Sequence, residues 1–197
     1  MKRRIAFLDF DGTITTKDTL LEIIKFQKGF ARFYLGLLIQ APILVAYKLK
    51  IISNHLAKQI LLRFFFGGMS ADVFQTRCDE FTIVVLPRLV RPKALIEIRK
   101  LLDSGVEVVV VSASAENWIK NWSNSLGLQL ISTILEHRNG LITGRFEGKN
   151  CYGKEKVRRI QIAYDLSKYD EIYCYGDSGG DKPMMSLATA SFFKPFR

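Results

Sequence analysis

The sequence has few of the cysteines that stabilise extracellular domains or bind zinc. Among its 197 residues are only Cys78, Cys151 and Cys174, which are widely spaced and form no C-x-x-C pair. This odd set argues against a disulfide framework and against a cysteine zinc site. The apolar run after the basic N-terminal residues is interrupted by Asp9 and Asp11, so we expect no secretory signal. We therefore predict a protein of the reducing cytoplasm.

Proline is also scarce, and neither low-complexity tracts nor internal repeats are visible. With five prolines, 48% hydrophobic residues and 24% charged residues, the composition is that of a globular protein rather than a disordered one. The length suits one core of about 130 residues plus a small insertion. The two histidines, His55 and His137, lie outside every motif described below, and we expect them at the surface.

The uncharged stretch 33–47 is too short to cross a bilayer as a helix. It has 15 residues, including Gln40 and Pro42, whereas a membrane-spanning helix needs about 20 apolar residues. Two interpretations remain open. The stretch either packs within a helical domain or rests on anionic lipid, with Arg32, Lys48 and Lys50 at the headgroups.

Acidic residues are outnumbered, 19 against 29 Lys and Arg, which gives a net charge of +10. Most of the excess lies in residues 25–93, where eleven basic residues face three acidic ones, a net charge of +8. This charge suits an anionic substrate, or a peripheral contact with an anionic membrane at the inner face. A basic nucleic-acid-binding module is the alternative, but no recognised motif accompanies the charge, so we expect no nucleic-acid partner. Nothing in the sequence sets the oligomeric state.

Short apolar runs alternate with helical patterns over most of the chain. Strands are expected at 5–8, 106–111, 128–135 and 171–175, and helices at 92–102, 115–126 and 154–166. This alternation predicts an α/β fold, a Rossmann-like parallel sheet with helices on both faces. Residues 20–91 break the pattern and read as helices. We therefore predict an α/β core formed by 1–19 and 92–197, with a helical cap, 20–91, inserted after the first strand.

Carboxylates follow two of the expected strands. Asp9 and Asp11 flank Phe10 at the end of the first strand, so an extended backbone would place both carboxylates on one side. Asp177 follows the last apolar run, and Asp181 comes four residues later. If these strands are neighbours, their carboxylates form an oxygen-rich site of the kind that Mg²⁺ prefers.

An anion could be held beside this metal. Ser112 ends the run 106–111, and its hydroxyl and the backbone N–H groups after it could bind phosphate oxygens. Alternatively, Ser112 or Ser114 caps the helix expected near Ala115. Lys154 and Lys156 open the helix that leads into the strand before Asp177, and either could supply the positive charge.

Together these segments resemble the four motifs of the haloacid dehalogenase superfamily of phosphatases. The motifs are Asp9-Phe10-Asp11-Gly12-Thr13, Val110-Val111-Ser112, Lys156, and Gly176-Asp177-Ser178-Gly179-Gly180-Asp181. The inserted helices resemble the cap of the phosphoserine-phosphatase-like branch. Residues 150–157 and 192–197 resemble subgroup IB of that branch, which includes phosphatidylglycerophosphate phosphatases.

The resemblance implies a magnesium-dependent phosphatase that forms an aspartyl-phosphate. It makes Asp9 the nucleophile and Asp11 the general acid and base. Mg²⁺ would be held by the Asp9 carboxylate, the Asp11 carbonyl and Asp177. The remaining motif residues are assigned to phosphate binding or to supporting the lysine and the metal ligands: Gly12, Thr13, Ser112, Ala113 and Lys156 for phosphate, and Ser178 and Asp181 for support.

The substrate is less well defined by the resemblance. A phosphoserine phosphatase has a cap glutamate nine residues after its nucleophile, where this chain has Asp18, a residue that could equally cap the following helix. Arg63 is a weak match to the cap arginine that binds the serine carboxylate, and it could instead lie on a solvated helix face. The candidates are a small phosphorylated metabolite, phosphoserine, and a phospholipid headgroup; a non-catalytic phospho-binding protein is the alternative of another class.

Overall fold

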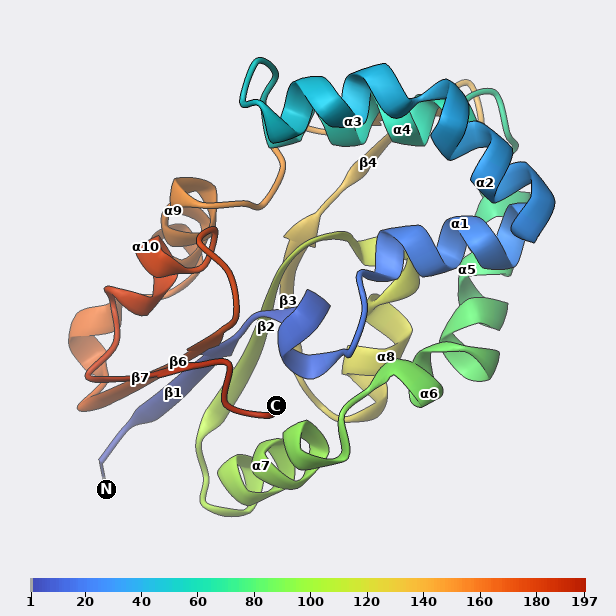
Figure 1. Cartoon of the computed structure of the whole chain (residues 1–197). Coiled ribbons are helices and arrows are strands. Elements are labelled where there is room, and N and C mark those ends of the chain that lie inside the picture. The colour runs from blue at the N-terminus through green and yellow to red at the C-terminus, as the bar shows by residue number, and fades with distance from the viewer. Residues whose placement is uncertain (1) are drawn as a thin grey trace.

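The computed structural model describes residues 2–197 and is built around a five-stranded parallel sheet (Figure 1). The strand order is β3-β2-β1-β6-β7, so β1 is central. Every pairing in this sheet is parallel. The strands are β1 (Arg4–Leu8), β2 (Glu107–Ala115), β3 (Gln129–Thr133), β6 (Glu171–Gly176) and β7 (Ala190–Phe193). The predicted α/β fold with a parallel sheet is therefore confirmed.

Both faces of the sheet are covered, which explains why its central strands are continuous apolar runs. Ala6 and Leu8 of β1 pack with α7 (Pro92–Asp103) and α8 (Lys120–Ser125) on one face. Ile5 and Phe7 pack on the other face with side chains of α9 (Lys154–Ala163) and α10 (Lys182–Met185). Residues 5–8 are wholly inaccessible to solvent. Asp9 follows β1 directly, so it lies at the carboxyl end of the central strand of the sheet.

The chain between β1 and β2 is helical, as expected. After one wide turn at Phe10–Ile14, the helices are α1 (Thr19–Lys28), α2 (Phe30–Ile39), α3 (Ala41–Lys48), α4 (Asn54–Phe66), α5 (Ala71–Val84) and α6 (Leu86–Leu89). In Figure 1, α2, α3 and α4 lie beyond the carboxyl ends of the strands, opposite α7. The division at residues 19, 20, 91 and 92 stays a prediction, since α1 and α5 share the hydrophobic core of α7 and α8.

An antiparallel hairpin, β4 (Leu135–Arg138) and β5 (Leu141–Phe146), was not predicted. Its backbone is hydrogen-bonded to the segment between α4 and α5: Gly68 N–H donates to Ile142 O, and Ile142 N–H donates to Met69 O. A segment of the chain after β3 thus packs against the cap helices.

Four of the predicted element boundaries were wrong. The strand expected at 106–111 continues to Ala115, after a register shift between Val111 and Ala115, so the helix begins later, as a 3-10 turn at Glu116–Trp118 followed by α8. The strand expected at 128–135 is split between β3 and β4. The helix expected to reach 166 ends at Ala163, because Tyr164 is extended; a short 3-10 turn follows at Leu166–Lys168.

Among the described residues, no single helix is long and apolar enough to cross a membrane. The pair α2 and α3 passes the same test of length and composition when taken together. The two helices are bent by 61° relative to each other at Gln40.

Candidate active site

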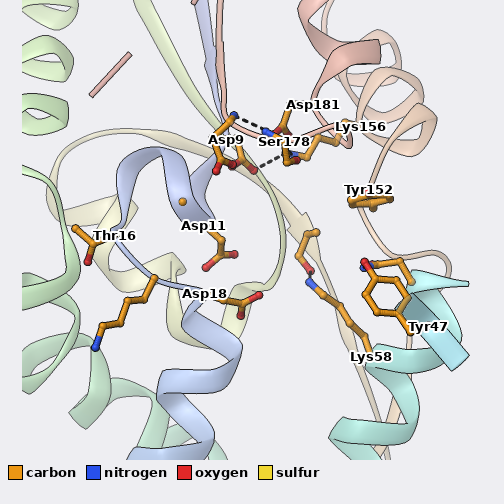
Figure 2. Close-up of a pocket in the computed structure, with 15 residues that line it drawn as sticks. Asp9, Asp11, Thr16, Asp18, Tyr47, Lys58, Tyr152, Lys156, Ser178 and Asp181 are labelled. Atoms are coloured by element: carbon orange, nitrogen blue, oxygen red, sulfur yellow. Dashed lines mark hydrogen bonds and ion pairs between the residues drawn. The ribbon is translucent and has the colours of Figure 1, made fainter. Parts of the chain in front are cut away.

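A cavity of about 370 Å³ lies where β1, β2 and β6 end, beneath the cap helices α3 and α4 (Figure 2). It is lined from both sides. The sheet side contributes motif residues, and the cap contributes polar side chains; the lining residues are Asp9, Asp11, Gly12, Thr16, Lys17, Asp18, Tyr47, Asn54, Lys58, Ala113, Tyr152, Lys156, Asp177, Ser178 and Asp181. This is the position that parallel α/β sheets use for ligands.

Lys156 joins two carboxylates at the base of this cavity. Its Nζ donates to Asp9 Oδ1 at 2.6 Å, to Asp181 Oδ1 at 2.8 Å and to the carbonyl oxygen of Val111 at 2.7 Å. The lysine is 1% exposed, so its three donors are all used inside the protein. Lys154 is exposed on the first turn of the same helix. The geometry therefore favours Lys156 over Lys154 as the lysine of the site.

The charges of this cluster depend on one another. Burial raises the pKa of the Asp9 carboxyl to about 7, although the nearby Lys156 acts to lower it. Burial acts to lower the pKa of Lys156, but Asp9 and Asp181 outweigh it and the pKa is raised, which keeps the ammonium charged. The pKa of Asp181 is lowered: burial opposes this, and Lys156 is the main cause.

Asp181 is held from both of its oxygens. While Oδ1 accepts from Lys156, Oδ2 accepts from the backbone N–H groups of Asp177 and Ser178 and from Ser178 Oγ. These bonds fix the loop that follows β6. In this structure Asp181 contacts Lys156, and Ser178 holds the loop through its bonds to Asp181.

A divalent cation fits beside Asp9 and Asp177. Carboxylate oxygens of Asp9, Asp177 and Asp181 lie within 4.8 Å of one another, a set of hard oxygen donors. Gly12 approaches this point with a φ of 84°, and a Cβ there would lie 2.6 Å from Asp177 Oδ2. Arg197 pairs with that oxygen at 2.6 Å, so Asp177 already holds one cation. Asp181 accepts four hydrogen bonds, whereas each oxygen of Asp9 and Asp177 has at most one partner among the described residues, so Asp9 and Asp177 are the carboxylates that would hold the metal.

The carboxylate of Asp11 points away from this oxygen cluster. Its Oδ1 accepts from the backbone N–H and the hydroxyl of Thr19, and its Oδ2 accepts from Ser114 Oγ at 2.5 Å. Asp11 still lines the cavity (Figure 2). Both oxygens of the Asp11 carboxylate are thus hydrogen-bonded, and the carboxylate is not part of the oxygen cluster of Asp9, Asp177 and Asp181.

Two predicted phosphate ligands, Ser112 and Thr13, are buried behind the cavity wall. Ser112 Oγ accepts from the backbone N–H of Ser114, and Thr13 Oγ1 donates to Asp9 Oδ2. Their neighbours Ala113 and Gly12 line the cavity in their place. The alternative that Ser112 or Ser114 caps a helix near Ala115 was wrong, since the strand continues there.

The structure brings Asp18 to the site but not Arg63. Asp18 lines the cavity and also caps α1, where its Oδ1 accepts from the backbone N–H groups of Leu20 and Leu21. Burial raises the pKa of Asp18, and the charge of Asp11 adds to this effect. Arg63 is exposed on another side of α4 and lines a separate hollow with Arg145. Its predicted role in substrate binding is therefore not supported by its position.

The sequence reasoning missed the side chains that the cap contributes. Lys58 of α4 reaches the cavity, and its Nζ donates to the carbonyl oxygen of Ala113 at 3.3 Å. Tyr47 and Asn54 come from the same part of the cap, and Tyr152 from the loop before α9 (Figure 2). Tyr152 lay in the segment 150–157 and Tyr47 at the end of the uncharged stretch 33–47, but neither was predicted to line the site. No local pattern distinguishes Lys58 from a solvated helix lysine.

The haloacid dehalogenase-like hydrolase family model matches residues 6–186, which include every residue of the Asp9, Lys156 and Asp181 cluster. The chain belongs to this family. It is 32% identical over 195 residues to Protein CicA of Caulobacter vibrioides, covering 98% of this chain and 86% of that protein. The sequence-based family assignment is thereby confirmed.

Solved structures with a similar fold are found as well. A protein of unknown function from Bordetella pertussis Tohama I has a TM-score of 0.84 at 23% identity, covering 97% of this chain and 89% of that one. A phospho-aspartyl intermediate analogue of phosphoserine phosphatase has a TM-score of 0.67 at 18% identity, covering 97% and 86%. At these identities the likeness concerns the fold. This family member therefore has a phosphoserine phosphatase-like fold.

Proposed function

We propose that this hydrolase cleaves phosphomonoesters in a Mg²⁺-dependent reaction, with a phosphoryl group carried transiently by Asp9. The observation that carries the proposal is the buried contact of Asp9 with Lys156, at the base of a cavity that Asp11 and Asp177 also line. A carboxylate held this way is fixed in position, and its second oxygen, which accepts one hydrogen bond from Thr13 Oγ1, still has a lone pair for reaction.

In the first step, an Asp9 carboxylate oxygen attacks phosphorus, and the bond from phosphorus to the leaving oxygen breaks. Asp11 donates a proton to that oxygen, so an alcohol leaves and an acyl phosphate remains on Asp9. In the second step Asp11 takes a proton from a water molecule, which attacks phosphorus and releases phosphate and the Asp9 carboxylate. Thr19 and Ser114, which hold the Asp11 carboxyl, position it for both transfers.

The charge of the phosphoryl group is matched by groups of this chain. Lys156 lies against Asp9, so its positive charge would lie close to a phosphoryl group carried by Asp9, and Gly12 and Ala113 line the same cavity. Asp9, Asp177 and the Asp11 carbonyl are the proposed magnesium ligands. When bound there, Mg²⁺ supplies positive charge against the phosphate oxygens.

Small phosphorylated molecules are the favoured substrate class, since a cavity of about 370 Å³ suits a compact ligand. Phosphoserine is one candidate, which the phosphoserine phosphatase-like fold and the position of Asp18 support. The cap arginine expected for that substrate has no counterpart at Arg63, and Lys58 is the cap cation that lines the cavity.

A phospholipid headgroup is the second candidate, of the phosphatidylglycerophosphate type. The observation that favours it is the row of exposed apolar side chains on α2 and α3, beside the cavity that Tyr47 of α3 helps to line. Membership of a hydrolase family favours either substrate over a basic nucleic-acid-binding or non-catalytic phospho-binding role.

The test is hydrolysis of p-nitrophenyl phosphate by wild type and Asp9→Asn, with Mg²⁺ and with EDTA. We expect Asp9→Asn to abolish hydrolysis, because an amide does not attack phosphorus, and we expect EDTA to abolish wild-type hydrolysis. Asp103→Asn, at the exposed end of α7, is the matched control and is expected to keep full activity. Retention of more than a few per cent of activity by Asp9→Asn would overturn the proposal.

A further inference from the structure

The outer surface of the cap exposes large apolar side chains. Phe30 is 70% exposed, Leu38 72% and Ile51 73%. We use the term α2–α3 face for this surface, which comprises Phe30, Tyr34, Leu35, Leu38, Ile39, Val45, Leu49 and Ile51. Contiguous exposed apolar residues of this kind mark interaction sites more often than chance surface positions.

Helix geometry shows that this face has no partner within the described chain. On α2, Phe30, Tyr34 and Leu38 recur every four residues and point to one side. The opposite side of α2 is buried: Phe33 packs against Phe65, and a Cβ at Gly36 would lie 2.3 Å from the same ring. The adjoining helix α3 is apolar yet contains no buried residue.

The charge around this face is of one sign. Arg32, Lys48 and Lys50 are exposed beside the apolar side chains, and the sequence has no acidic residue between Glu22 and Asp72. Apolar side chains beside basic ones are the pattern of helices that lie in the interface of anionic membranes.

We propose that the α2–α3 face docks onto the surface of an anionic lipid bilayer, with the apolar side chains among the acyl chains and Arg32, Lys48 and Lys50 at the headgroups. A second copy of this chain is a poorer occupant, because a symmetric contact would bring the same basic residues together without acidic partners. The helices lie on the bilayer rather than span it, since they are bent by 61° and have ten and eight residues.

Docking would place the membrane beside the cavity entrance. Tyr47, one residue before Lys48 on α3, lines the cavity that contains Asp9 (Figure 2). A second hollow, lined by Lys48, Lys50 and Asn54, adjoins it through Tyr47 and Tyr152. An amphiphilic phosphomonoester in the bilayer would therefore be the substrate best presented to the site. This consequence rests on the proposed phosphatase activity, whereas docking itself does not.

Flotation of the purified protein with vesicles tests whether the basic residues of the α2–α3 face contribute to membrane binding. We expect binding to phosphatidylcholine vesicles that contain phosphatidylglycerol, weaker binding to phosphatidylcholine alone, and loss of binding as salt rises. Lys48→Glu with Lys50→Glu should weaken binding about 25-fold or more, at about fivefold for each lysine lost. Lys93→Glu with Arg99→Glu makes the same charge change on exposed positions of α7 and should cost much less.

The contribution of the apolar side chains to vesicle binding is tested with the double variant Leu35→Gln with Leu38→Gln. The matched control is Ile96→Gln with Ile162→Gln, at comparably exposed positions of α7 and α9. Only the first pair should lose vesicle binding, and it should keep hydrolysis of p-nitrophenyl phosphate. No binding of wild type to anionic vesicles at low salt would overturn the proposal. Formation of a dimer, measured by sedimentation without lipid and abolished by the first pair, would also overturn it in favour of a second copy.

Discussion

At the scale of single residues, Lys156 compensates the charge of the two carboxylates beside it and fixes their orientation. A buried lysine is stable only when its charge is compensated, and here Asp9 and Asp181 both lie within 2.8 Å. The same contacts hold the Asp9 carboxylate in one orientation. The residue therefore contributes both to stability and to the geometry of the proposed nucleophile.

Replacing Lys156 by Met should reduce both the stability of the protein and its activity, whereas replacing the exposed Lys154 should reduce neither. The variant leaves two buried carboxylates unpaired, which should lower the free energy of unfolding by about 3–5 kcal/mol. Its kcat should fall about 100-fold or more, because one charge opposite the transferring phosphoryl group is lost. Lys154→Met is the matched control and should change neither quantity measurably by urea denaturation and steady-state kinetics. Equal effects of the two variants would contradict the assignment of Lys156.

Asp11→Asn should slow both half-reactions, since the amide can neither donate nor accept the proton as a carboxyl does. We expect kcat to fall about 100-fold or more. The Mg²⁺ concentration for half-maximal activity should stay within a few-fold of wild type, because the side chain is bonded to Thr19 and Ser114 rather than directed at Asp177. A large rise in that concentration would instead make the carboxylate a metal ligand.

Asp9, Asp177 and Lys156 have a local signal in the sequence, because each stands directly after an apolar strand or at the start of a helix. Asp9 and Asp177 were found in this way. Lys58 was missed and Arg63 was chosen instead, although both lie on α4. Which side of a cap helix faces the cavity depends on tertiary packing, and the sequence of α4 is apolar on more than one side.

At the scale of elements, the parallel strands were predictable because burial on both faces makes them continuous apolar runs. The β4–β5 hairpin was not, because Leu141–Phe146 has Thr143, Gly144 and Arg145 in its centre and shows no clear alternation. The structure explains why residue 144 is a glycine. Its φ is 77°, and a Cβ there would lie 2.3 Å from the Cα of Arg63. The hairpin and α4 therefore approach as closely as their backbones allow.

Gly144→Ala should test this contact, with Gly148→Ala as its matched control. Both glycines have positive φ, but a Cβ at Gly148 meets nothing within 4 Å. The control should lose about 1–2 kcal/mol of unfolding free energy from backbone strain. Gly144→Ala should lose a further ~1–3 kcal/mol from overpacking against α4, measured by urea denaturation. Equal losses would show that the hairpin and α4 are not in close contact.

At the scale of the whole molecule, the site is assembled from segments that lie far apart in the chain. Asp9, Lys156 and Asp181 come from the end of β1, the first turn of α9 and the loop after β6, and α3 and α4 add Tyr47 and Lys58 to the cavity lining. The parallel sheet brings these segments to one edge because β6 pairs directly with β1. This architecture places Asp9, the proposed nucleophile, in the lining of the cavity.

The most direct test of this account is to identify the phosphorylated residue during turnover. Wild type and Asp11→Asn would be mixed with a phosphomonoester and Mg²⁺, quenched with acid within milliseconds and analysed by peptide mass spectrometry. The account predicts a phosphoryl group on the peptide that contains Asp9, at the Asp9 side chain, and none in Asp9→Asn. Phosphorylation of another residue such as Ser112, or no phosphorylated protein in either sample while product forms, would contradict it.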